Sequence, residues 1–447
     1  MKPAHYPEQL DLLPYIGKWS AIASLVAALA GTASAFFLFA LAWATAWREA
    51  HPWVIWLLPL AGFFVGWLYL HLGKTVEAGN NLLIDEIHDP KQVVPLRMAP
   101  LVLAGTLISH LCGASVGREG TAVQMGGALA DQLTRLFRLA QADRRILLMA
   151  GISAGFASVF GTPMAGAIFA LEVLAIGRMR YDAIFPCFLA AIVADQVGLA
   201  WGVQHTHYVL AASEPVAFWS VVAVMAAGIL FGLVGMVFAN TTHALSGFMK
   251  RHVAYAPLRP FIGGIIVAGA VWLLGTQRYI GLGIPVILAS FQQPLAPWDF
   301  VGKLVFTVTS LGAGFKGGEV TPLFYIGATL GNALAPLLHL PFALLAGLGF
   351  VAVFAGAANT PIACTIMAIE LFGPNIGPFA ALACIVSYLF SGHTGIYHAQ
   401  RIGQSKHRSL PEGLKISEWR VQRVHLKQAR QDAETASNKA RLTSESD

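Results

Sequence analysis

Charged residues are scarce in this sequence, and their scarcity excludes an ordinary soluble domain. Asp, Glu, Lys and Arg together make up 12% of the 447 residues, whereas a soluble domain has roughly 25%. Hydrophobic residues account for 56%. The composition therefore predicts a protein that crosses a membrane several times.

Patterns for metal binding are missing as well. His88, His110 and His393 have no Cys or His neighbour at ligand spacing, so we expect neither a metal nor another cofactor. The four cysteines stand singly in apolar segments, and we interpret them as thiols packed in the core. They are Cys112, Cys187, Cys364 and Cys384.

Long apolar stretches are abundant. Five are long enough to span a bilayer, which takes about 20 apolar residues: residues 16–47, 53–72, 181–201, 217–238 and 258–274. Four others, bounded by Gly or Pro, are shorter and predict helices that stop part-way through the membrane: residues 121–134, 163–176, 283–291 and 361–372. Irregular backbone at that depth needs protein or a water-filled path around it, so we expect a cavity.

An internal duplication organises the chain. Residues 117–121 (Gly-Arg-Glu-Gly-Thr) are echoed 200 residues later by 317–322 (Gly-Gly-Glu-Val-Thr-Pro), and 161–163 (Gly-Thr-Pro) are echoed 198 residues later by 359–361 (Asn-Thr-Pro). A nearly constant offset indicates two half-proteins, and such halves typically place a substrate site at their interface. The predicted division is residues 1–15, a first repeat 16–205, a second repeat 206–400 and a tail 401–447.

Both ends of the chain are predicted to face water. Residues 1–18 are polar and the apolar run after them is too long for a cleavable signal peptide, so the first span should stay in the membrane. The tail holds ten of the 29 Lys and Arg, which predicts a cytoplasmic location. We interpret its charge as solvated and not as a nucleic-acid site, and we expect its last fifteen residues to be disordered.

Each copy of the duplicated motif places one carboxylate in apolar surroundings. Glu119 precedes a helix start without bulky side chains, where free N–H groups favour an anion. Its carboxylate could fill that place when the substrate leaves, and desolvation favours its protonation. A permanent ion pair with Arg118 is the alternative. For Glu319, the alternative is a structural acceptor of hydrogen bonds from Thr321 or from backbone amides.

Two neutral donors extend the candidate site. Asn80 opens an apolar stretch, and its amide suits a small hard anion, with an ordinary helix cap as the alternative. Tyr397 follows the last apolar segment, where a tyrosine at the membrane interface is the alternative. The Gly-x-Ser-x-Gly spacing around Ser153 resembles a hydrolase motif, but we interpret it as small residues at helix contacts.

These motifs resemble the CLC family of anion channels and proton-coupled antiporters over about residues 15–400. Residues 117–120 match its Gly-Arg-Glu-Gly-Pro signature, and residues 317–322 match its Gly-x-Phe-x-Pro loop. The resemblance implies an all-α inverted repeat with tilted and re-entrant helices, in a homodimer with one pathway per subunit. Glu119 would then be the gating glutamate and Tyr397 the anion-coordinating tyrosine.

Departures from the family pattern indicate a branch. Asn80 replaces the serine of chloride-type members, Val320 replaces their loop phenylalanine, and Thr121 replaces a proline. This pattern looks like the bacterial fluoride/proton antiporter branch, and fluoride, being strongly hydrated, needs firm donors. Val173 stands where some chloride exchangers carry an internal proton glutamate, so Glu319 is the candidate for helping Glu119. We predict structural roles for the neighbouring carboxylates, Glu172 and Glu370.

The sequence therefore predicts a fluoride/proton antiporter of the bacterial inner membrane, driven by proton entry and conferring fluoride resistance. The alternative is a chloride-selective CLC channel or chloride/proton exchanger, and we expect no enzymatic activity. Fluoride, protons, the lipid bilayer and a second subunit are the expected partners. The predicted gating residues are Glu119 and Glu319, and the predicted anion-binding residues are Asn80, Gly120, Thr121, Val320, Thr321 and Tyr397.

Overall fold

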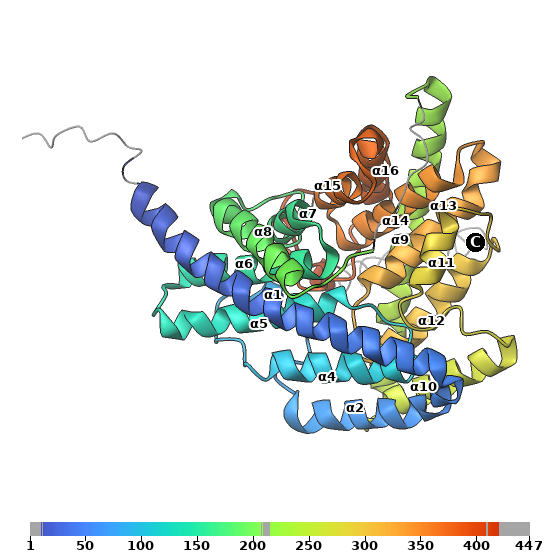
Figure 1. Cartoon of the computed structure of the whole chain (residues 1–447), viewed down its shortest axis with the longest axis horizontal. Helices are drawn as coiled ribbons and strands as arrows, with labels where there is room; N and C mark the ends of the chain where they lie inside the picture. Colours follow the sequence, from blue (N-terminus) through green and yellow to red (C-terminus); the bar gives the residue numbers. More distant parts are fainter. Residues whose placement is uncertain (1–9, 11, 207, 209–214, 408–409, 420–447) are drawn as a thin grey trace, which may run out of the picture.

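The computed structural model describes residues 10, 12–206, 208, 215–407 and 410–419. The first half comprises α1 (Leu12–Ala50), η2 (Pro52–Leu57), α2 (Leu58–Leu72), α3 (Asn80–His88), α4 (Met98–Leu111), α5 (Glu119–Leu136), α6 (Gln141–Phe160), α7 (Pro163–Glu172), η3 (Tyr181–Ala183) and α8 (Ile184–Ala200). The second half comprises α9 (Phe218–His252), α10 (Leu258–Leu274), α11 (Ile284–Ser290), α12 (Asp299–Ala313), α13 (Val320–Leu338), α14 (Phe342–Ala358), α15 (Pro361–Phe372), η4 (Pro374–Ile376) and α16 (Gly377–Phe390). The fold is all-α, as predicted, and the two halves lie side by side (Figure 1).

Helix lengths agree with most of the predicted spans. Among the described residues, five helices are long and apolar enough to cross a membrane: Leu12–Ala50, Pro52–Leu72, Tyr181–Ala200, Phe218–His252 and Val320–Leu338. The predicted span 258–274 is instead the shorter helix α10, and α13 takes its place in this set. The expected short helix 121–134 is α5, which is longer at both ends, from Glu119 to Leu136 (18 residues), and is not among the helices long and apolar enough to cross a membrane.

Glycines allow the central helices of each half to pack with their backbones in contact. A Cβ atom built on Gly126 of α5 would lie 2.3 Å from the carbonyl oxygen of Gly151 in α6. The second half repeats this contact, since a Cβ atom on Gly327 of α13 would lie 1.9 Å from the carbonyl oxygen of Gly349 in α14. Ser153 is buried in α6 and donates a hydrogen bond to the Cys187 carbonyl at 2.7 Å. The Gly-x-Ser-x-Gly motif is therefore a helix contact, as predicted.

The halves also cap each other's short helices. The Glu172 carboxylate, at the end of α7, accepts hydrogen bonds from the N–H groups of Ile362 (3.1 Å) and Ala363 (2.8 Å) at the start of α15. In return, the Glu370 carboxylate of α15 accepts bonds from the first N–H groups of α7, at 2.9 and 2.8 Å. This exchange agrees with the structural roles that the sequence predicts for both residues.

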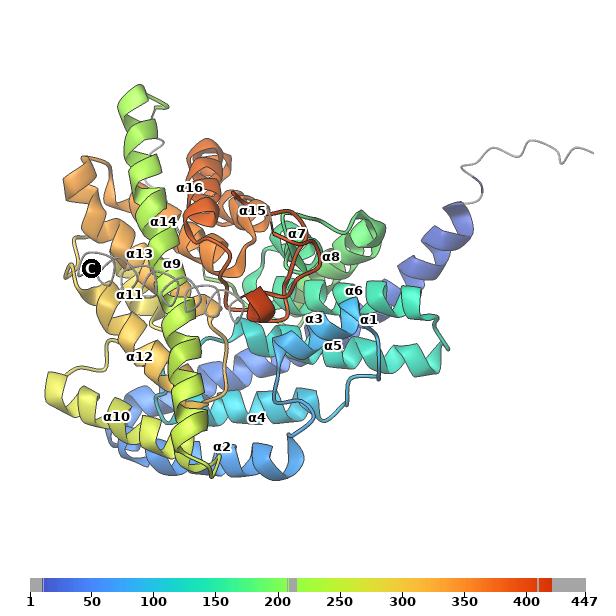
Figure 2. The ribbon, with the colours of Figure 1, turned by 180° about the vertical axis from the view of Figure 1, so that it is seen from behind.

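The described part of the C-terminal tail is not free in solution. Strand β2 (Arg401–Ile402) pairs in parallel with β1 (Ala175–Ile176) of the first half. Farther on, Lys415 Nζ lies 2.6 Å from Asp85 Oδ1 of α3, and the red C-terminal segment lies beside α3 in Figure 2. The described residues after 400 therefore pack on the first half. The last fifteen residues, for which disorder is predicted, lie outside the described residues.

Candidate functional site

The two copies of the duplicated motif meet at the boundary between the halves. The Gly117 N–H donates to the Gly318 carbonyl at 2.6 Å, and the Gly318 N–H donates to the Gly117 carbonyl at 2.8 Å. A Cβ atom on Gly117 would lie 2.9 Å from the Gly318 carbonyl oxygen, so glycine is needed for this approach. The pairing fixes the starts of α5 and α13, and the two glutamates with them, next to one another.

Glu119 is buried at this junction, with 1% of its surface exposed, and its carboxylate is held by the other half. The Thr321 hydroxyl donates to Glu119 Oε1 at 2.5 Å, and the Thr321 N–H donates to Oε2 at 3.1 Å. Thr321 is the second residue of α13, so the carboxylate occupies a helix N-terminus. A helix N-terminus offers free N–H donors and a partial positive charge, which suit an anion.

The ion pair with Arg118 is also present. Glu119 therefore both occupies the helix N-terminus, as a carboxylate in the anion site would, and pairs with Arg118. Arg118 Nε lies 3.6 Å from Glu119 Oε1, and the Arg118 N–H donates to Oε2 at 3.2 Å. The bonds from Thr321 are shorter than the distance to the guanidinium. For Glu319, the alternative is a bond from Thr321 or from backbone amides. The Thr321 hydroxyl is taken by Glu119, and a backbone hydrogen bond at Glu319 itself is present.

Asn80 faces the same junction from α3. The helix N-cap is Gly79, at φ +59°, and no side chain caps the helix, so the helix-cap interpretation of Asn80 is wrong. Asn80 Nδ2 lies 3.1 Å from the position that a Cβ atom on Gly120 would take, and Glu319 Oε2 lies 3.9 Å from that point. Asn80 Oδ1 is buried without a hydrogen-bond partner among the described residues. The Asn80 amide and the Glu319 carboxylate therefore both lie close to Gly120.

The cavity that the sequence predicts opens beside these groups. It has a volume of about 720 Å³, and Asn80, Glu319 and Tyr397 are among the residues of its wall. Tyr397 is 4% exposed, and its ring packs edge-on against Phe169 with 6.4 Å between centroids. A tyrosine of the membrane interface would be exposed, so that interpretation is wrong.

Two predicted anion-binding residues are placed differently. The Thr121 hydroxyl is 2.7 Å from the Thr106 hydroxyl, and both side chains are buried within the first half. Val320 is 1% exposed and can offer only its backbone. The structure thus brings Asn80, Gly120 and Tyr397 together with the two glutamates, and leaves the Thr121 side chain engaged elsewhere.

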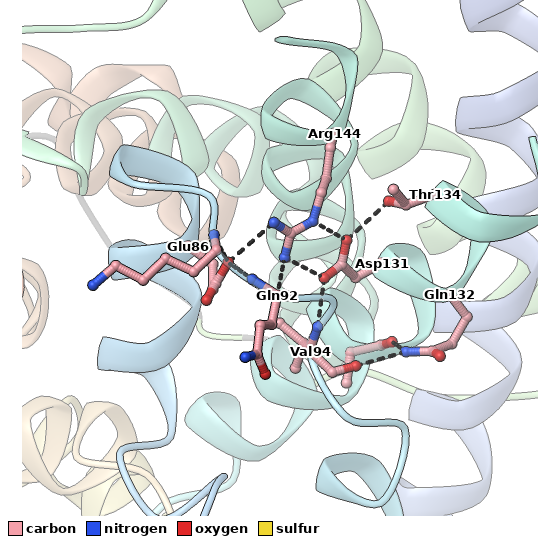
Figure 3. A network of polar contacts seen from close by, with 9 residues as sticks. Glu86, Gln92, Val94, Asp131, Gln132, Thr134 and Arg144 are labelled. Atoms are coloured by element: carbon pink, nitrogen blue, oxygen red, sulfur yellow. Dashed lines mark hydrogen bonds and ion pairs between the residues drawn. The ribbon is translucent and has the colours of Figure 1, made fainter. Parts of the chain in front are cut away.

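A short helix carries Asn80, and a buried polar cluster supports it (Figure 3). Glu86 of α3 accepts a bond from Arg144 Nη1 of α6 at 3.0 Å, and Arg144 Nε donates to Asp131 of α5 at 2.8 Å. Arg144 is 5% exposed. From the other side, the Ala399 N–H donates to the Asn81 side chain at 3.0 Å. These bonds set where α3 begins.

Sequence reasoning missed the cations around the cavity. Lys316, in the loop between α12 and α13, lines it, as do Lys74, Lys250 and Arg259. A lysine three residues before Glu319, in the short loop between two apolar helices, was the available signal, since ionisable residues within membrane segments are usually functional. In the described part of the chain, no group of three His, Cys, Asp or Glu side chains could hold a metal.

Fold and site together define a duplicated membrane protein with a carboxylate-bearing junction between its halves. Residues 61–392 match the family model described as "Voltage gated chloride channel". The chain belongs to the CLC family of anion channels and antiporters.

Individual relatives place the chain within this family. A "Chloride/fluoride channel protein" of Pseudomonas syringae pv. tomato is 70% identical over 97% of this chain and 96% of its own length. An "H(+)/Cl(-) exchange transporter ClcA" of Vibrio vulnificus is 28% identical over 78% of this chain and 81% of its own length. A crystal structure of a CLC-type fluoride/proton antiporter superimposes with a TM-score of 0.84, at 37% identity, over 86% of this chain and 98% of its own. The chain therefore resembles the fluoride/proton branch of the family.

Proposed function

We propose that this protein is a fluoride/proton antiporter that exports fluoride from the cytoplasm, is driven by proton entry and confers fluoride resistance. The observation that carries the proposal is the position of the Glu119 carboxylate, bonded to the hydroxyl and N–H of Thr321 at the start of α13. The same donors suit a fluoride ion. Carboxylate and anion therefore compete for one place, and protonation of Glu119 would favour the anion.

Neutral donors and a second carboxylate support fluoride as the anion. Fluoride is a strong hydrogen-bond acceptor, and a site must replace its water with several donors. Asn80 provides an amide beside Gly120, and the nearness of the Glu319 carboxylate to the same glycine supports a role for Glu319 in proton movement. Two relatives also support fluoride as the anion. The protein from Pseudomonas syringae is named a chloride/fluoride channel protein, and the similar crystal structure is that of a fluoride/proton antiporter. We further propose a homodimer in the bacterial inner membrane, with the tail in the cytoplasm.

Transport from liposomes tests the proposal. Liposomes with the purified protein are loaded with fluoride, and a fluoride electrode and a pH electrode follow efflux and proton uptake. We expect fluoride efflux to drive protons uphill into the liposomes. Fluoride efflux without proton movement would indicate a fluoride channel and not an antiporter. Chloride exchange without a preference for fluoride would favour the alternative, a chloride-selective channel or exchanger.

A further inference from the structure

Lys316 is half-buried in the wall of the cavity, whereas Lys74 and Lys250 are exposed. Its stem fills a notch beside α4, since Lys316 Cβ and Cγ lie 3.0 and 3.1 Å from the position of a Cβ atom on Gly105. Its ammonium lies over the ring of Tyr69, 4.0 Å from the centroid. Aromatic faces attract cations. The side chain is therefore held in one place, with its charge at the cavity wall.

The ammonium has no carboxylate in direct contact. Among the described residues, Lys316 makes no ion pair within 4.0 Å and no hydrogen bond to a side chain or backbone. Glu77 and Lys250 are the charged groups that act on it through space. Lys316 also lines a smaller adjoining cavity of about 90 Å³ together with Lys74, Lys250 and Arg259. The charge on this wall is mostly positive, with Glu77 as the acidic member.

We propose that Lys316 holds a second anion site, in the cavity, where fluoride binds before it reaches the junction at Glu119. An ammonium offers three N–H donors and a full positive charge, which offset the loss of water from a strongly hydrated ion. Lys316 and Glu319 line the same cavity and are three residues apart in one loop, so the two anion positions are adjacent. This inference rests on the proposed function for the identity of the ion.

The site should act through charge and not through selection of one halide. Its donor is a charged ammonium on an open cavity wall, whereas Asn80 is a neutral amide packed against Gly120. We therefore expect loss of Lys316 to weaken fluoride and chloride binding alike. Loss of a fixed neutral donor at the junction should change their ratio instead.

Initial rates of transport from liposomes, measured against fluoride concentration at constant ionic strength, test the site. Lys316→Met should raise the KM for fluoride tenfold or more, with kcat and the ratio of protons to fluoride within twofold of the wild type. Lys316→Arg keeps the charge, so its KM for fluoride should lie within threefold of the wild-type value. Lys74→Met is the matched control. Lys74 lines both cavities but is exposed to water, so the KM of Lys74→Met for fluoride should lie within twofold of the wild-type value.

Two results would overturn the inference: an unchanged KM in Lys316→Met, or an equal rise in Lys74→Met. An unchanged KM together with a changed proton ratio would make Lys316 a partner of Glu319 in proton transfer. If Lys316→Met does not fold, Lys316→Gln replaces it in the same comparison. If the wild type moves chloride without fluoride preference, the proposed function fails, and the KM for chloride then tests Lys316 separately.

Discussion

Glu119 links the two halves of the chain through a single carboxylate. One oxygen accepts the Thr321 hydroxyl and the other accepts the N–H groups of Thr321 and Arg118. Bonds to a charged acceptor are worth about 1.5–3 kcal/mol each. The carboxylate can leave this place only when something else satisfies the donors, and a fluoride ion or a proton on Glu119 changes that balance.

Replacing Glu119 by Gln should abolish coupled exchange. The amide mimics the protonated carboxyl in shape but cannot release a proton, so fluoride movement and proton movement separate. In liposomes with a fluoride gradient, Glu119→Gln should show no uphill proton movement above that of protein-free liposomes. Normal proton pumping by this variant would contradict the gating role.

Replacing Asn80 by Ala should reduce the preference for fluoride over chloride by about tenfold or more. The change removes a neutral donor beside Gly120, and loss of one hydrogen bond to a charged group, roughly 1.5–3 kcal/mol, corresponds to that factor. Chloride accepts hydrogen bonds more weakly and should lose less. Paired efflux measurements with fluoride and chloride electrodes decide it, and an unchanged ratio would remove Asn80 from the selective site.

At the scale of elements, α3 depends on its neighbours for its position. It has 9 residues, and helices that short are marginal without tertiary support. Glu86 anchors it to Arg144, which also pairs with Asp131. Because Asn80 is the first residue of α3, this buried cluster positions a donor of the candidate site.

Replacing Arg144 by Met should destabilise the fold by about 3–5 kcal/mol, because it leaves two buried carboxylates without their cation. Thermal unfolding in detergent measures the loss. Lys18→Met is the control: Lys18 pairs with Asp143, next to Arg144, but the two side chains are 40% and 27% exposed. Such exposed pairs contribute about 0–1 kcal/mol. Equal unfolding temperatures for wild type and Arg144→Met would refute the anchoring role.

Local patterns in the sequence account for part of this arrangement. The duplicated motifs predict that Glu119 and Glu319 occupy equivalent places, and glycine spacing predicts close helix contacts. The partners of buried polar groups were not predictable. Arg144 and Glu86 are 58 residues apart, and Lys316 meets Tyr69 of the first half. Which charges meet depends on the packing of distant helices, for which the sequence carries no periodic signal.

The whole molecule is held by contacts that each half makes to the other. Glu172 caps α15 and Glu370 caps α7, so each short helix starts on a carboxylate from the opposite repeat. Carboxylates are favourable at helix N-termini. These caps join the halves on the side of α7 and α15, while the paired loops join them at the candidate site.

Glu172→Ala and Glu370→Ala should each destabilise the protein by about 0.5–2 kcal/mol, the usual cost of a lost N-terminal cap. Neither should alter the ratio of protons to fluoride, because these caps are not among the residues that hold Glu119. Glu412→Ala is the control, since Glu412 is 65% exposed in its pair with Arg178. Unfolding curves and coupled flux are measured on the same samples, and a changed proton ratio in Glu172→Ala would give Glu172 a role in transport.

The backbone pairing of Gly117 with Gly318 restricts how the protein can vary from one generation to the next. A Cβ atom on Gly318 would lie 2.8 Å from the Gly120 nitrogen, and one on Gly317 would lie 2.5 Å from the Val116 side chain. A mutation in either loop therefore has its effect in the opposite repeat. Because Gly117 and Gly318 meet backbone atoms of the opposite loop, no side-chain change there relieves the clash, and libraries that randomise either loop should keep glycine at both positions. Although 200 residues separate the two loops in the sequence, each limits which residues the other can accept.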